Sequence, residues 1–236
     1  MNSNRDLKIF AVEFLETNLK GDILFKKGIE KSPDVLFLHG AGQSERKRFL
    51  LLRNMLLKNT ELSSCSFDFI GHGETGGQLK SSSLQERTEQ ASTVIDVFFK
   101  ENPLSIVAAS MSAYTAIKLT ERYKVDNLVL IVPAVYWNTV YPVKFCDGFS
   151  DMIRTPYSWK KTDAWSILDK FHGKVCVISA ENDQVIPVEI ISEIYAHAKQ
   201  CSHLIIKDSG HQLLAFINNS PEALNKVSAA IAATLS

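Results

Sequence analysis

Three side chains that could carry nucleophilic chemistry each follow a stretch typical of a buried β-strand. Ser110 comes after the run SIVAA, Asp183 after VCVISA, and His211 after HLIIKD. A serine hydroxyl is a poor nucleophile at neutral pH unless a neighbouring base takes its proton, and histidine suits that task best. A carboxylate can hold the imidazole in the required tautomer and stabilise its charged form. These residue types therefore predict a Ser-His-Asp triad, provided that the fold brings the strand ends together.

Each of these residues also has a simpler interpretation. Ser110 could be a small residue in a tight bend, Asp183 a turn carboxylate, and His211 a loop histidine with one satisfied hydrogen bond. Asp208 is a competing acid, but its place in the same loop as His211 makes it less able to orient the ring. Ser112 is the weaker nucleophile candidate, because a position two residues into a helix would turn it away from the strand ends.

The elements that must position these residues alternate along the chain. Near-continuous apolar strands separated by helices indicate a parallel sheet with helices on both faces. In such a sheet, sites form outside the carboxyl ends of the strands, where the three candidates stand. We expect strands at 34–40, 104–110, 127–135 and 174–180, a strand that ends in a glycine-rich loop at 64–73, and a strand with a following loop at 202–211. Helices are expected at 44–59, 82–102, 112–123, 187–199 and 221–235.

Two further segments complete the expected α/β fold. The stretches IFAVEFLE and DILFKKG, joined by a polar link that contains Gly21, predict an N-terminal antiparallel hairpin. The range 134–171 holds all three tryptophans and two prolines, although a simple crossover needs only a dozen or so residues. We expect it to form a small cap inserted over the strand ends, within a single domain that spans 1–236. The alternative is a surface crossover helix with irregular flanks.

Five motifs in a fixed order carry a resemblance to a known family. They are FLHGAGQS, FDFIGHGETGG, VAASMSA, ISAENDQVIP and DSGHQLL. With these motifs, and with its candidates in the order Ser, Asp, His, the sequence resembles the α/β-hydrolase fold superfamily over nearly its whole length. Within that superfamily it looks most like the small serine esterases with a short cap. The resemblance implies an oxyanion hole formed by the backbone N–H groups of Ala41 and Met111.

One part of the nucleophile motif departs from that family. The usual turn is Gly-x-Ser-x-Gly, whereas Ala108 and Ser112 take the two glycine positions here. Small residues are needed because strand and helix backbones approach closely around the nucleophile, and both substitutes are small.

These observations predict a serine hydrolase that cleaves a carboxylic ester through an acyl-enzyme, without a metal or organic cofactor. The aromatic residues of the cap predict an apolar or aromatic acyl pocket, whose expected lining is Tyr136, Trp137, Phe145 and Trp159. Thioesterases, C–C bond hydrolases, peptidases and acyltransferases use the same triad, so these activities remain alternatives. A non-catalytic ligand-binding protein of this fold is the alternative from a different class.

The amino-acid composition limits which binding partners and which cellular compartment we expect. The 26 basic and 26 acidic residues balance, so nothing indicates binding to nucleic acid or to an anionic membrane. The sequence begins without the apolar core of a signal peptide, and no run approaches the ~20 apolar residues that span a bilayer. The four cysteines form no C-x-x-C pair, which favours reduced thiols in the cytoplasm. We expect a cytoplasmic protein with a small-molecule ester substrate, and no feature indicates its oligomeric state.

Overall fold

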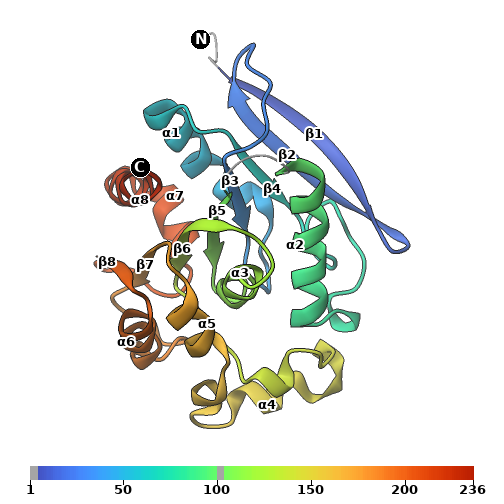
Figure 1. Cartoon of the computed structure of the whole chain (residues 1–236), viewed down its shortest axis with the longest axis vertical. Coiled ribbons are helices and arrows are strands. Elements are labelled where there is room, and N and C mark those ends of the chain that lie inside the picture. Colours follow the sequence, from blue (N-terminus) through green and yellow to red (C-terminus); the bar gives the residue numbers. More distant parts are fainter. Residues whose placement is uncertain (1–4, 100–103) are drawn as a thin grey trace.

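The computed structural model describes residues 5–99 and 104–236, in which the strands form one central sheet (Figure 1). The strands are β1 (Arg5–Phe14), β2 (Thr17–Lys26), β3 (Val35–Leu38), β4 (Ser64–Phe67), β5 (Leu104–Ala109), β6 (Val125–Ile131), β7 (Lys174–Ala180) and β8 (Gln200–Ile206). Their order across the sheet is β1-β2-β4-β3-β5-β6-β7-β8. β1 and β2 pair antiparallel, β2 pairs antiparallel with β4, and β3 to β8 pair in parallel. This arrangement confirms the expected mostly parallel sheet with an N-terminal hairpin.

Helices cover both faces of the sheet, as predicted. Alternate residues of a strand point to opposite faces, so Leu36 and Ile106 pack with α2 and α3, whereas Val35 and Val107 pack with α1 and α8. In the described ranges, no helix is both long enough and apolar enough to cross a membrane. The helices are α1 (Leu50–Thr60), α2 (Leu84–Phe98), α3 (Ser112–Leu119), α4 (Ser150–Arg154), α5 (Ala164–Lys170), α6 (Val188–His197), α7 (Leu213–Asn219) and α8 (Pro221–Leu235).

The hairpin turns earlier along the chain than the sequence suggested. β1 and β2 meet at Leu15 and Glu16, and Leu15 adopts a left-handed backbone with φ of 51°. Gly21 lies inside β2, opposite Phe10, and a Cβ atom there would overlap the Phe10 ring. Placing the turn at Gly21 was therefore wrong, because this glycine gives room for close packing between strands and does not bend the chain.

Several element boundaries also differ from the expected ones. β4 ends at Phe67, and the expected loop follows it, beginning with Asp68, whose carboxylate forms a buried ion pair with Arg46. The helix expected over 82–102 is α2, which begins after the N-cap Ser83 and ends at Phe98. The expected positions 100–102 lie outside the described residues. Helix α7, directly after His211, was not predicted.

The segment between β6 and β7 has no long helix. It consists of short helical turns, including α4 and α5, joined by irregular chain. In Figure 1 the part around α4 lies at one end of the molecule, away from the sheet. The predicted cap, 134–171, lies within this segment.

Candidate active site

Ser110 occupies a sharp turn between β5 and α3. Its backbone is left-handed, with φ of 50°, a conformation that costs a residue with a side chain about 1–3 kcal/mol. Neighbouring backbone holds it there: the Ser110 N–H donates to Ile131 O at 2.9 Å, and the Ser110 carbonyl accepts from Ala113 and Ala134 at 2.9 and 3.2 Å. A strained residue that several backbone bonds fix in place is typical of a nucleophile presented at a strand end.

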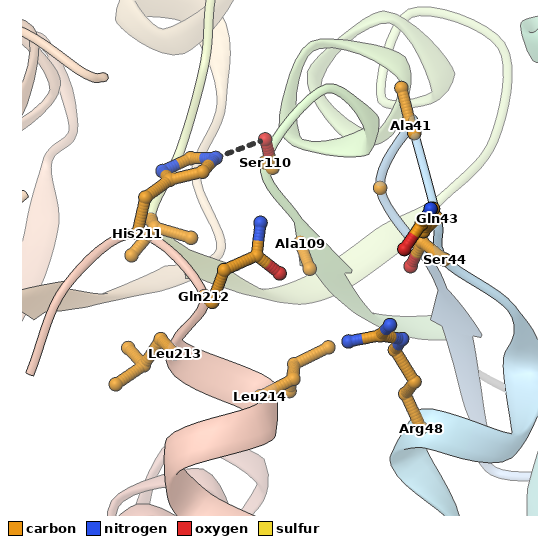
Figure 2. Close-up of a pocket in the computed structure, with 13 residues that line it drawn as sticks. Ala41, Gln43, Ser44, Arg48, Ala109, Ser110, His211, Gln212, Leu213 and Leu214 are labelled. Atoms are coloured by element: carbon orange, nitrogen blue, oxygen red, sulfur yellow. Dashed lines mark hydrogen bonds between the residues drawn. The ribbon is translucent and has the colours of Figure 1, made fainter. Parts of the chain in front are cut away.

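The fold brings the three candidate residues together at the carboxyl ends of β5, β7 and β8. Ser110 Oγ lies 3.1 Å from His211 Nε2, as the dashed line in Figure 2 shows. On the other side of the ring, His211 Nδ1 lies 3.0 Å from Asp183 Oδ2. The serine hydroxyl can therefore donate to the imidazole while the imidazole donates to the carboxylate. This is the geometry that general-base activation of a serine requires.

The carboxylate of Asp183 is fixed by the chain that follows it. Its Oδ1 accepts hydrogen bonds from the N–H groups of Val185 and Ile186, at 2.8 and 3.0 Å, which leaves Oδ2 for the imidazole. The competing acid, Asp208, is exposed, and its backbone N–H donates to Glu181 Oε2 at 2.9 Å. Within the described chain, the ion pair of His211 is with Asp183. The structure therefore brings Asp183 to the ring.

The loop after β3 approaches the Ser110 turn closely. A Cβ atom on Gly40 would lie 3.2 Å from the Ser110 Cβ and 3.3 Å from Ala109 O, so a larger residue would push the loop away. In the described part of the chain, the backbone N–H groups of Ala41 and Met111 donate to no backbone carbonyl. Both groups belong to residues that flank Ser110 in space or in sequence, and both remain available to an acceptor bound beside it.

A buried hydrogen-bond network fixes this loop from behind. The Ser112 hydroxyl donates to the His39 carbonyl at 2.5 Å, and Arg87 Nη2 donates to the same carbonyl at 2.8 Å and to Ser112 Oγ at 2.9 Å. All three side chains are buried. Ser112, which replaces the usual glycine, is thus a link between α3 and the loop after β3.

The His39 imidazole is a second link within this loop. Its Nδ1 lies 2.7 Å from Gly40 O, and its Nε2 accepts from the Phe69 N–H at 3.1 Å. Burial, together with the nearby Arg87 charge, holds the pKa of His39 well below its usual value. A neutral ring is the form that can accept at Nε2.

Arg87 is the residue of this network that sequence reasoning missed. Its guanidinium lies 3.7 Å from the centre of the Phe69 ring, and its Nε and Nη1 atoms find no hydrogen-bond partner among the described residues. Burial lowers the pKa of Arg87 to about 9, which leaves the group charged at neutral pH. Its helical spacing from Leu84 and Ala91 places it on the buried face of α2, and that spacing is the signal that could have identified it.

The cavity at Ser110 has a volume of about 320 Å³ and lies between the loop after β3 and helix α7. Figure 2 shows Ser110 and His211 on one side of it and Arg48 on another. In residues 5–99 and 104–236, no group of three or more His, Cys, Asp or Glu side chains is placed to hold a metal ion. The cavity is lined by Gly40, Ala41, Gly42, Gln43, Ser44, Arg48, Ala109, Ser110, Val132, His211, Gln212, Leu213 and Leu214.

The four aromatic residues predicted to line an acyl pocket lie elsewhere. Tyr136 and Trp159 line a separate cavity of about 610 Å³ between the β6–β7 segment and the start of α6. Trp137 and Phe145 are partly buried and pack against the hydrophobic core. An aromatic acyl pocket therefore stays a prediction that concerns the second cavity.

Comparison with known proteins identifies solved structures with a similar architecture. No family model matches the sequence, and no curated protein matches it significantly. A predicted CIB-like hydrolase from Thermoplasma acidophilum is 14% identical, with a TM-score of 0.71 over 97% of this chain and 99% of its own. Est1E from Butyrivibrio proteoclasticus, solved with ferulic acid, is 16% identical, with a TM-score of 0.71 over 94% and 99%. A monoacylglycerol lipase from Paleococcus ferrophilus is 17% identical, with a TM-score of 0.67 over 92% and 98%. Together with the sheet order and the turn at Ser110, these similarities establish that the chain has the α/β-hydrolase fold.

Proposed function

We propose that this protein is a serine hydrolase that cleaves a carboxylic ester through an acyl-enzyme. The observation that carries the proposal is the pair of hydrogen bonds from the strained Ser110 through His211 to Asp183. Ser110 Oγ attacks the ester carbonyl while His211 Nε2 takes the hydroxyl proton and then gives it to the departing alcohol. Water next attacks the acyl-enzyme with His211 again as base, which releases the carboxylic acid and restores Ser110.

The available N–H groups support the tetrahedral step of this reaction. When the carbonyl oxygen becomes negatively charged, the Ala41 and Met111 N–H groups can donate to it without breaking a bond to another carbonyl of the described chain. Removing one such donor typically costs about 3 kcal/mol of transition-state stabilisation. The backbone of Ala41 is held in turn by the His39, Arg87 and Ser112 network behind it.

The similar structures support the same reaction class. They include a predicted hydrolase, an esterase and a lipase, and one of them was solved with ferulic acid, an aromatic acid. The cavity beside Tyr136 and Trp159 is the place where this chain could hold an apolar or aromatic acyl group, with the β6–β7 segment as its cap. A cytoplasmic location and a small-molecule ester as the partner are parts of the same proposal.

Hydrolysis of p-nitrophenyl esters tests the proposal directly. The panel runs from acetate to octanoate and includes benzoate, and the variants are Ser110→Ala and Ser112→Ala. We expect the wild type to turn over at least one ester and Ser110→Ala to lose roughly 10³-fold or more in kcat. Ser112→Ala should keep measurable turnover, because its hydroxyl contacts His39 and Arg87 and not the substrate.

A fluorophosphonate probe identifies the nucleophile independently of the ester chosen. Mass spectrometry should place the adduct on Ser110 in the wild type and in Ser112→Ala. A folded wild type that neither hydrolyses the panel nor reacts with the probe would overturn the proposal in favour of a ligand-binding protein.

A further inference from the structure

Arg48 stands apart from its basic neighbours in the short helical turn Arg46–Phe49. Arg46 pairs with Asp22, Asp68 and Glu74, and Lys47 also pairs with Glu74. Arg48 takes part in none of the ion pairs found among the described residues, although it is only partly exposed. Instead it lines the Ser110 cavity, and Figure 2 shows its guanidinium reaching into the space between Leu214 and Ser44.

The chain holds Arg48 in this position from two sides. Its neighbours Arg46 and Phe49 are fully buried, so they anchor the turn that carries it. Its own carbonyl accepts a hydrogen bond from Asn218 Nδ2 at 2.9 Å. Asn218 belongs to α7, whose first residues also line the cavity. Arg48 and the α7 wall of the cavity are therefore joined, and the guanidinium has a fixed base from which to reach a ligand.

The rest of the lining suits a ligand with one anionic end. Among the described residues, no acidic side chain lines the cavity, and Gln43, Ser44 and Gln212 add neutral hydrogen-bonding groups. Leu213 and Leu214 supply an apolar wall. Arginine binds carboxylates through paired N–H donors, and such charge-assisted bonds strengthen where the site is partly shielded from water.

We infer that the ester substrate carries a carboxylate, which Arg48 binds while Ser110 attacks the ester carbonyl. This inference rests on the proposed esterase function and names its substrate class. A volume of about 320 Å³ limits the group between the two ends to a short chain or one ring. Hydrolysis adds one water molecule across the ester bond and releases an alcohol and a carboxylic acid. The carboxylate that Arg48 binds takes no part in this reaction and remains unchanged. That carboxylate can belong to the acyl part or to the alcohol part of the ester.

Two pairs of esters separate these sources while keeping size nearly constant. The acyl pair is mono-p-nitrophenyl adipate, which is charged, and methyl p-nitrophenyl adipate, which is neutral. The alcohol pair is 4-acetoxybenzoate and its neutral methyl ester. Each is assayed with the wild type, with Arg48→Met, and with Lys47→Met as the matched control. Lys47→Met removes one positive charge next to Arg48 in sequence, from a side chain that lies outside the cavity.

In at least one pair, we expect the wild type to prefer the charged ester by about tenfold or more in kcat/KM, as one charge-assisted bond would give. Arg48→Met should abolish this preference, because kcat/KM should fall further for the charged ester than for the neutral one. Lys47→Met should keep the preference. Raising the salt concentration should weaken it, because mobile ions screen charges that remain partly exposed.

Hydrolysis of neutral esters without a preference for charged ones, or a preference that survives Arg48→Met, would overturn the inference and leave the esterase proposal intact. If the wild type hydrolyses no ester, a binding measurement tests the role of Arg48 instead. Calorimetric titration of adipate into Ser110→Ala, and into the same variant with Arg48→Met, should then show binding only in the first. Equal binding or no binding in both would overturn the inference as well.

Discussion

The loops around Ser110 and the segment between β6 and β7 differ in how their side chains are held. Around Ser110, the side chains of Ser112 and His39 are fixed by hydrogen bonds to buried backbone, and the His211 ring is held between Ser110 Oγ and the Asp183 carboxylate. The β6–β7 segment relies on aromatic packing. Phe149 contacts both Tyr136 and Phe145, and Trp159 meets Trp165 edge to face.

Polar contacts also attach the β6–β7 segment to the rest of the molecule. Asp163 accepts a hydrogen bond from Tyr114 Oη at 2.5 Å and one from Lys118 at 3.1 Å, and these bonds attach the start of α5 to α3. Directional bonds fix atoms to within fractions of an ångström, whereas packed rings tolerate changes of shape. Under the proposed function, we expect the strand-end loops to set the chemistry and the β6–β7 segment to set which substrates fit.

The largest effect expected is that of Asp183→Asn. The change removes the charge that orients His211 while keeping the shape of the side chain, so kcat should fall roughly 10³- to 10⁴-fold. The control is Asp208→Asn in the neighbouring loop, which should retain kcat within about twofold. Steady-state kinetics on the best p-nitrophenyl ester measures both. Equal losses of kcat in the two variants would contradict the assignment of Asp183 as the carboxylate that orients His211.

A smaller loss of activity is expected from Ser112→Gly, which restores the usual motif residue. The change removes the hydroxyl between the His39 carbonyl and Arg87, so the loop that carries Ala41 should be held less firmly. We expect kcat/KM to fall about tenfold and the free energy of unfolding to drop by about 1–3 kcal/mol.

Ser92→Ala provides the control for Ser112→Gly. Ser92 is another buried serine, and its hydroxyl has no partner among the described residues. Its loss should leave kcat/KM unchanged. If Ser112→Gly proves as active as the wild type, the polar network around Ser112 does not set the chemistry. The contrast drawn between the strand-end loops and the β6–β7 segment would then be wrong for the loops.

Trp159→Ala tests whether the β6–β7 segment determines which substrates fit. Removing this indole enlarges the cavity next to Tyr136, so kcat/KM should change about fivefold for p-nitrophenyl benzoate and octanoate and less than twofold for the acetate. Trp165→Ala is the control, because that indole contacts Trp159 without lining the cavity. A uniform loss across all esters would show that the segment affects the reacting groups and not the fit of substrates.

The smallest effect concerns the dependence of stability on pH. The folded-state pKa of His39 lies below its unfolded value of about 6.5, so the unfolded chain binds more protons as the pH falls below that value. The stabilisation is complete above the unfolded pKa and is lost towards the folded one. The melting temperature should therefore fall between pH 7.5 and pH 5.5.

The contribution of His39 is isolated by His39→Gln, which should make this fall in melting temperature shallower. His72, whose pKa burial also lowers, is unchanged in the variant, so part of the slope should remain. His172→Gln changes an exposed ring outside the network and should reproduce the wild-type slope. Parallel slopes for wild type and His39→Gln would contradict the expected role of the buried ring.

The sequence indicates where Ser110, Asp183 and His211 lie because each of them follows a strand that contains a run of apolar residues. Once the strands are arranged in parallel, their ends must meet, and the positions of Ser110, Asp183 and His211 follow. The turn of the hairpin was misplaced because a glycine can serve close packing as well as bending, and only the partner strand distinguishes the two.

Contacts that depend on distant partners were the ones that the sequence did not reveal. Arg87 interacts with a carbonyl 48 residues away, and Arg48 differs from the paired Arg46 in its burial and in which carboxylates lie near it in space. The lining of the aromatic cavity raises the same difficulty, because irregular chain with short helical turns has no periodicity from which side-chain directions can be inferred.

The position of β8 at the edge of the sheet has a consequence for synthesis. The bond between Ser110 and His211 spans 101 residues, and the imidazole follows the strand that joins the sheet last along the chain. Because domains begin to form from their N-terminal parts during translation, a chain still attached to the ribosome holds its nucleophile long before its base. The proposed hydrolase would therefore emerge inert and gain reactivity only when its final strand is released and docks.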